Sequence, residues 1–77
     1  TPGIGMFDMI IANINRNVLL KDIPYYSMHI NSGGTMLLSG FYENDLPMIR
    51  EKTEGYGFRY EDHKERNNWV AARFIKI

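Results

Sequence analysis

Phe7-Asp8-Met9-Ile10-Ile11-Ala12-Asn13-Ile14 is a largely apolar run that ends at an asparagine, and the chain then turns polar at Asn15 to Asn17. A continuous apolar run, in contrast to an alternating one, is typical of a strand that is covered on both faces. We therefore expect a buried strand in a parallel sheet beneath a layer of helices. Ligands bind beyond the carboxyl ends of the strands in such sheets, which makes Asn13 the first candidate site residue.

A helix is expected after this strand, because four apolar residues recur at spacings of four, three and four: Leu19, Ile23, Tyr26 and Ile30. Pro24 lies inside the pattern and predicts a kink, or two short helices that meet near Asp22 and Ile23. Asn31-Ser32-Gly33-Gly34 is expected to end the helix, with glycine as its C-cap.

A second short apolar strand, Thr35 to Ser39, follows the helix and ends at Gly40. A strand, a helix and a strand joined by tight turns form a right-handed unit in which the two strands are parallel. Both strands then end at the same edge of the sheet. Asn13 should therefore lie beside Ser39 and Gly40.

A second helix is expected to start near Asn44 or Asp45, either of which can cap it, and to bury Leu46, Ile49 and Thr53. Helical spacing of these three residues gives the helix one apolar stripe. We expect that stripe to pack on the same face of the sheet as the first helix.

The last two predicted strands decide the order of the sheet. Phe58 to Lys64 is charged and is expected at an edge, whereas Trp69 to Ile77 is more apolar and should return inside it, after a turn at Glu65 to Asn68. We predict an α/β fold with strand order 1-2-4-3, three of the four strands in one direction, two helices on one face and a terminal antiparallel hairpin. Residues 1–6 are expected to be a flexible lead-in, and residues 7–77 to form one unit.

Composition narrows the function classes. Nine Lys and Arg residues balance nine Asp and Glu residues, so no overall field attracts nucleic acid or an anionic membrane. No apolar run approaches the roughly 20 residues that span a bilayer. The chain has no cysteine, which excludes disulfides and thiolate metal sites and suits a reducing compartment. We expect a cytoplasmic protein without direct contact to nucleic acid or membrane.

Common catalytic motifs are not recognisable. His29 and His63 lie on different predicted elements, neither at a metal-ligand spacing, so no metal site is expected. Gly33-Gly34 follows a helix, which is the wrong direction for a phosphate loop. Ser39 is followed directly by Gly40 and lacks the pattern that surrounds a nucleophilic serine.

Two residues each allow two interpretations. Asn13 carries an acceptor and two donors to the rim of the sheet, where it could bind a ligand or could only cap the next helix or a turn. Trp69 begins the last strand at the same edge, so its indole could face a pocket beside Asn13 and Gly40, or pack under the hairpin turn. Without further information the capping and packing interpretations are favoured.

Several signatures together resemble one protein family. In chain order they are Ala12-Asn13-Ile14, the helix with Pro24, Ser32-Gly33-Gly34, Leu38-Ser39-Gly40, Gly57-Phe58 and Trp69-Val70-Ala71. In order and spacing they resemble the carboxy-terminal half of the ribosomal protein L11 methyltransferases, which are class I S-adenosylmethionine-dependent enzymes. The resemblance implies a Rossmann-like sheet of seven strands, of which this chain would carry the last four.

The resemblance also implies a function, namely methyl transfer from S-adenosylmethionine to amino groups of a large-subunit ribosomal protein. Asn13 matches the family's asparagine, which contacts the cofactor and lies by the site of transfer. Related amino-methyltransferases follow this asparagine with two prolines and an aromatic residue, and these are absent here. Three residues are candidates for positioning the substrate: Ile14, through its backbone carbonyl, Gly40 and Trp69.

The chain lacks two further parts of such a cofactor site: a glycine-rich loop after the first strand and an acidic residue after the second. We therefore expect these 77 residues alone neither to bind S-adenosylmethionine usefully nor to catalyse. Without the first three strands, the edge of Phe7 to Ile14 and one apolar sheet face should be exposed, which predicts self-association. The alternative function is a non-enzymatic α/β interaction module that binds a partner through this edge.

Overall fold

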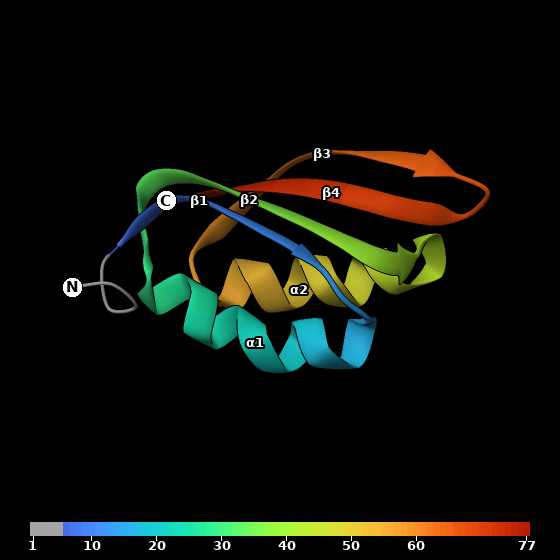
Figure 1. The fold of residues 1–77 in the computed structure, drawn as a ribbon, viewed down its shortest axis with the longest axis horizontal. Helices are drawn as coiled ribbons and strands as arrows, with labels where there is room; N and C mark the ends of the chain where they lie inside the picture. Colours follow the sequence, from blue (N-terminus) through green and yellow to red (C-terminus); the bar gives the residue numbers. More distant parts are fainter. Residues whose placement is uncertain (1–5) are drawn as a thin grey trace.

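The computed structural model describes residues 6–77 and shows a four-stranded sheet with two α-helices on one of its faces (Figure 1). In chain order the elements are β1 (Phe7–Asn13), α1 (Arg16–Met28), β2 (Ile30–Tyr42), the 3₁₀ turn η1 (Glu43–Asp45), α2 (Leu46–Gly55), β3 (Phe58–Arg66) and β4 (Trp69–Lys76). The predicted flexible lead-in lies outside the described residues except for Met6. No helix in the described part of the chain is long and apolar enough to cross a membrane.

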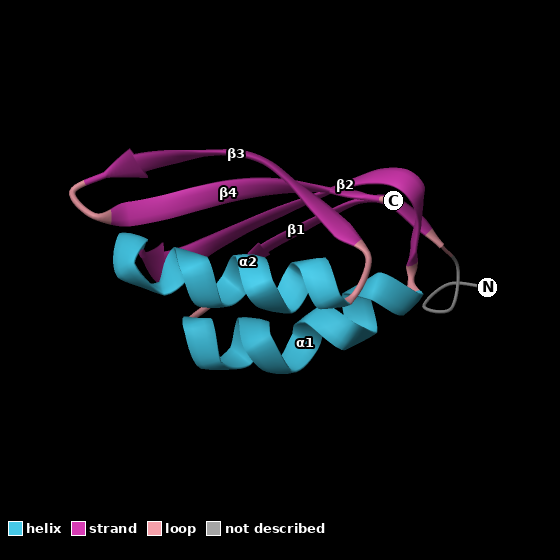
Figure 2. Cartoon of the chain, turned by 180° about the vertical axis from the view of Figure 1, so that it is seen from behind, coloured by secondary structure: helices cyan, strands magenta, loops and turns pink. Residues whose placement is uncertain are grey.

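The strand order β1-β2-β4-β3 confirms the order predicted for the sheet. β1 and β2 are parallel, and β4 is antiparallel to both β2 and β3, so three of the four strands point the same way. Figure 2 shows the hairpin of β3 and β4 from behind, with β3 on the outside. The apolar β4 gains burial in the interior, while the charged side chains of β3 stay in water at the edge.

One hydrophobic core lies between the sheet and the two helices. α1 contributes Leu19 and Ile23, and α2 contributes Leu46, Ile49 and Thr53, which confirms the predicted stripe of α2. The strands contribute Ala12, Ile30, Met36, Leu38, Phe41, Phe58, Val70, Ala72 and Phe74. Because both helices pack on this face, no described element covers the opposite face of the sheet.

α1 differs from the prediction in its shape. It is one continuous helix with Pro24 inside it, so of the two predicted shapes, a kink or two short helices, the second is wrong. Leu19 and Ile23 are fully buried, and their packing holds the helix together across the hydrogen bond that proline cannot donate. The helix ends at Met28, and the N–H of His29 donates to the carbonyl of Tyr26 at 3.1 Å.

β2 begins earlier than predicted. Ile30 pairs with Phe7 and belongs to the strand, and Gly33-Gly34 lies within β2, so the C-cap interpretation of these glycines is wrong. The buried side chain of Ile30 happens to continue the helical spacing of α1, which caused the error. Gly33 has a φ of 85° where the pairing with β1 is irregular.

β1 is more exposed than its apolar sequence indicated. Ile11 is 69% exposed and Met9 is 53% exposed, while Ala12 is the buried residue of the strand. The expectation of a strand covered on both faces is wrong for this chain, because both helices lie on one face. The later expectation of a bare face and an open edge is confirmed, since β1 lies at the end of the sheet.

The hairpin turn is shorter than predicted. β3 continues through Arg66, and the turn consists of Asn67 and Asn68, with φ values of 54° and 68°. Asparagine tolerates this left-handed conformation better than most residues, and a two-residue turn of this kind matches the twist of the paired strands.

Candidate functional site

The carboxyl ends of β1 and β2 lie side by side at one edge of the sheet, where α1 and α2 also begin (Figure 1). We call this the carboxyl edge; it comprises residues 13–17, 39–45 and 67–69. Asn13 is the register partner of Ser39, and the N–H of Ile14 donates to the Ser39 carbonyl at 3.1 Å. The predicted neighbourhood of Asn13, Ser39 and Gly40 is therefore confirmed.

Asn13 presents its side chain on the uncovered face of the sheet, opposite to the buried Ala12. It does not cap α1. The cap is Asn15, whose Oδ1 accepts a hydrogen bond from the N–H of Val18 at 3.0 Å. The helix-capping interpretation of Asn13 is thus wrong, and its exposed amide makes no side-chain hydrogen bond to another described residue.

Gly40 and Ile14 lie in close backbone contact beside this asparagine. Gly40 has a φ of 99°, and a Cβ at this position would lie 2.5 Å from the carbonyl oxygen of Ile14. The pairing of β2 with β4 also shifts at this point, between Ser39 and Phe41. Only glycine allows β2 to bulge here and still admit the Ile14 carbonyl.

Trp69 lies at the same edge and packs against Tyr42. The two residues are register partners, with ring centroids 5.1 Å apart and ring planes at 80°. Trp69 is 45% exposed and Tyr42 is 53% exposed. Trp69 does not line the hollow beside Gly40; Tyr42 lines it, and Trp69 contacts Tyr42.

Two adjoining hollows at the carboxyl edge share Tyr42 as a wall. The first hollow, of about 260 Å³, is lined by Gly40, Phe41, Tyr42, Asp45 and residues 15–17. The second hollow, of about 420 Å³, is lined by Tyr42, Glu43, Asn44 and Asn68. The sequence patterns did not mark Tyr42, Asn44 or Asn68 as site residues. The signal present for the two asparagines was their position just after the ends of β2 and β3.

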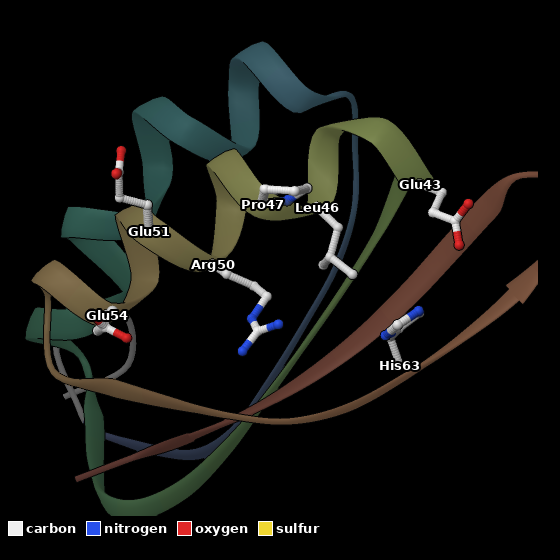
Figure 3. Close-up of a pocket in the computed structure, with 7 residues that line it drawn as sticks. All are labelled: Glu43, Leu46, Pro47, Arg50, Glu51, Glu54 and His63. Carbon is white, nitrogen blue, oxygen red and sulfur yellow. The ribbon is translucent and has the colours of Figure 1, made fainter.

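A third hollow, of about 510 Å³, lies between α2 and β3 and is shown in Figure 3. Arg50 projects into it from α2 and stacks on Tyr60, with its guanidinium carbon 3.9 Å from the ring centroid. His63 faces it from β3 and hydrogen-bonds the Tyr60 hydroxyl. Three glutamates also line it, Glu43, Glu51 and Glu54, together with Leu46 and Pro47. Apart from Glu43, its residues lie outside the carboxyl edge.

Titratable side chains elsewhere are engaged in local contacts. His29 stacks on Tyr25 with ring centroids 4.3 Å apart, and its Nδ1 lies 2.9 Å from the Tyr25 carbonyl. The pKa of Tyr26 is raised, mainly by burial of the hydroxyl and secondly by the nearby Asp22 carboxylate. Tyr26 lies near the end of α1 that is away from the carboxyl edge. Within residues 6–77, no group of three or more His, Cys, Asp or Glu residues is arranged to hold a metal ion.

The sequence matches one protein family along nearly its whole length. The family model described as ribosomal protein L11 methyltransferase (PrmA) matches residues 3–76. The ribosomal protein L11 methyltransferases of Phocaeicola vulgatus and Porphyromonas gingivalis are each 52% identical to the chain, over 73 and 69 residues. The matches cover 95% and 90% of the chain but only 26% and 24% of these relatives. The chain thus spans about a quarter of their length.

Solved structures show the same fold. The crystal structure of ribosomal protein L11 methylase from Lactobacillus delbrueckii subsp. bulgaricus matches with a TM-score of 0.88 and 28% identity, covering 99% of this chain and 40% of that one. The M1.HpyAVI–SAM complex matches with a TM-score of 0.76 and 22% identity, covering 94% of this chain and 45% of that one. The second likeness concerns the fold alone. The sheet order and these neighbours show a Rossmann-like methyltransferase fold.

Proposed function

Because the chain belongs to the ribosomal protein L11 methyltransferase family, we propose that an enzyme containing it transfers methyl groups from S-adenosylmethionine to amino groups of ribosomal protein L11. The observation that supports a role for this chain is the unengaged amide of Asn13 at the carboxyl edge, since Asn15 has taken over the helix cap. A cytoplasmic location is part of the same proposal, because the substrate is a ribosomal component. The alternative of a free-standing interaction module is not favoured, since the family match spans residues 3–76.

Asn13 orients the target amine in this proposal. Methyl transfer to nitrogen requires a neutral amine whose lone pair points at the methyl group, and positioning supplies most of what the protein adds. The side-chain oxygen of Asn13 accepts one N–H of the amine, and the carbonyl of Ile14, admitted by Gly40, accepts another. Trp69 bounds the approach through its contact with Tyr42.

The proposed activity is tested with the enzyme containing this chain, purified ribosomal protein L11 and S-adenosylmethionine carrying a labelled methyl group. Label transferred to amino groups, located by mass spectrometry of peptides, is the expected result. A protein substrate with its amino groups blocked beforehand is the matched control. Label on no amine of L11 at any enzyme concentration would overturn the proposed function.

The described residues by themselves do not form a complete site for S-adenosylmethionine, which would supply the methyl group. β1 passes into α1 through Ile14 and Asn15, without glycine, so no glycine-rich loop follows a parallel strand here. Asn13 contributes one contact at an open edge in place of an enclosed pocket. The fit of these residues to the cofactor is therefore partial.

We accordingly predict that the 77-residue chain alone gives no measurable heat of binding in calorimetric titration with S-adenosylmethionine. The physical reason is that an open rim leaves most of the cofactor in water, whereas small-molecule sites enclose most of the ligand surface. The longer enzyme, titrated in the same buffer, is the positive control. Clear micromolar affinity of the isolated chain would contradict the prediction.

Self-association of the isolated chain is a further part of the proposal. The outer edge of β1 has no strand partner among the described residues, and Met9 and Ile11 expose apolar surface beside it. Unpaired backbone groups next to apolar side chains favour pairing with a second copy. Sedimentation velocity at high concentration is expected to show dimers or larger species.

Ile11→Lys should return the isolated chain to the monomer, because it places a charge in the exposed apolar face of β1. Val18→Lys is the matched control, since Val18 is also exposed but lies on α1. A wild-type chain that sediments as a clean monomer, or an Ile11→Lys variant that associates as strongly as Val18→Lys, would argue against this interface.

A further inference from the structure

Tyr42 occupies a central position at the carboxyl edge, between the first hollow and the second hollow. Tyr42 is 53% exposed, and its ring rests edge-to-face on Trp69, which restrains the orientation of the ring. An exposed aromatic ring that is already held in place can bury apolar area on binding without first being ordered. Rings of this kind act as anchors in protein interfaces.

The walls of the two hollows are tied together by bonds that do not depend on a ligand. Arg16, at the start of α1, forms an ion pair with Asp45, just before α2, with a nitrogen to oxygen distance of 3.0 Å. The N–H of Glu43 donates to the carbonyl of Asn68 in the hairpin turn at 2.8 Å. The groove is therefore preformed, which lowers the cost of binding.

The chemistry of the lining suits an uncharged polar chain. Amide side chains of Asn44 and Asn68 each offer an acceptor and two donors, which is what a peptide backbone also carries. The charges of Arg16 and Asp45 cancel within their ion pair, which leaves Glu43 as the one unpaired formal charge of the lining. Such a lining favours neither a strongly anionic nor a strongly cationic ligand.

We propose that the two hollows form a groove for an extended polypeptide segment of the protein substrate, anchored by Tyr42 and flanking the amine that Asn13 receives. This assignment rests on the proposed function and names a surface that binds the substrate away from the reacting atoms. An apolar side chain of the segment packs on Tyr42, and its backbone hydrogen-bonds the asparagine amides. Residues that bind the segment contribute to KM for the protein and not to the chemistry of an amine too small to reach the groove.

The test measures methylation kinetics of the enzyme containing this chain, with ribosomal protein L11 and with the small amine Nα-acetyl-lysine methylamide. Tyr42→Ala is expected to raise KM for the protein about tenfold and to change KM for the small amine far less. Tyr42→Phe keeps the ring and should restore the wild-type KM. Tyr56→Ala is the matched control, because Tyr56 is 42% exposed but lies beyond the other end of α2.

Asn44→Ala is a second variant that tests the groove even if Tyr42→Ala does not fold. Asn44 is exposed and its side chain makes no hydrogen bond to a described residue, so this variant should fold normally. It is expected to raise KM for the protein severalfold. If both variants were active and had the wild-type KM for the protein, the groove proposal would be overturned and the proposed function would stand. Equal loss of activity toward protein and small amine would also overturn it. A wild-type enzyme that methylates no ribosomal protein would overturn the proposed function together with the substrate assigned to this groove.

Discussion

Gly40→Ala is expected to lower the free energy of unfolding of the chain by about 3 kcal/mol. Two effects add at this position. The backbone has a φ of 99°, which side chains rarely adopt, and the new Cβ would lie 2.5 Å from the Ile14 carbonyl oxygen and 2.9 Å from the Ile14 nitrogen. These backbone atoms of Ile14 cannot rotate away as a flexible side chain would, so Ile14, just after the end of β1, must move away from β2 at the carboxyl edge.

Alanine substitutions at two other glycines separate the effect of backbone strain from the effect of the close contact with Ile14. Gly33 has a φ of 85° with open space around a Cβ, so Gly33→Ala should cost about 1 kcal/mol from backbone strain alone. Gly55 ends α2 with neither strain nor a close neighbour, and Gly55→Ala should be neutral or stabilise by up to about 1 kcal/mol. Urea unfolding followed by circular dichroism measures all three. A Gly40→Ala midpoint equal to that of Gly33→Ala would show that the contact with Ile14 contributes nothing.

If Asn13 orients the target amine as proposed, Asn13→Ala should lower kcat of the enzyme containing this chain about 100-fold, because the amine would lose one acceptor. Stability should change little, since the exposed amide makes no side-chain hydrogen bond to a described residue. Labelled methyl transfer to L11 measures kcat, and circular dichroism verifies the fold.

Asn13→Asp and Asn31→Ala are the matched controls for this variant. The aspartate keeps an acceptor oxygen in place and should retain more activity than the alanine. Asn31 hydrogen-bonds Asp8 at 2.8 Å near the start of β2, away from the carboxyl edge, and Asn31→Ala should leave kcat unchanged. If Asn13→Ala retained wild-type kcat, Asn13 would have no part in orienting the amine.

Much of the fold follows from the sequence, because polarity differed sharply between neighbouring segments. The charged segment of β3 and the apolar β4 sufficed to predict that β4 inserts between β2 and β3, and the structure confirms it. The end of α1 could not be predicted, because Ile30 is buried at a strand start and yet fits the helical spacing. The spacing of apolar residues predicts which residues are buried, but it does not tell the end of a helix from the start of a strand.

The site was predictable in part. Asn13, Ser39 and Gly40 meet because parallel strands share an edge, and this required only the strand boundaries. Tyr42 could not be found in the same way. Its contact with Trp69 depends on the register between β2 and β4, which shifts at Gly40, and a one-residue shift reverses the face on which a side chain lies.

The exposure of β1 has a consequence for the rate at which its backbone amides exchange with deuterium. This strand carries Asn13, yet it buries one side chain and pairs along one edge only, so it should open locally far more often than the central strands β2 and β4. Any element that pairs with the free edge of β1 stabilises the closed form. An element that binds the free edge of β1 therefore also holds Asn13 in its place in the strand. The protection of the β1 amides against deuterium exchange measures both effects.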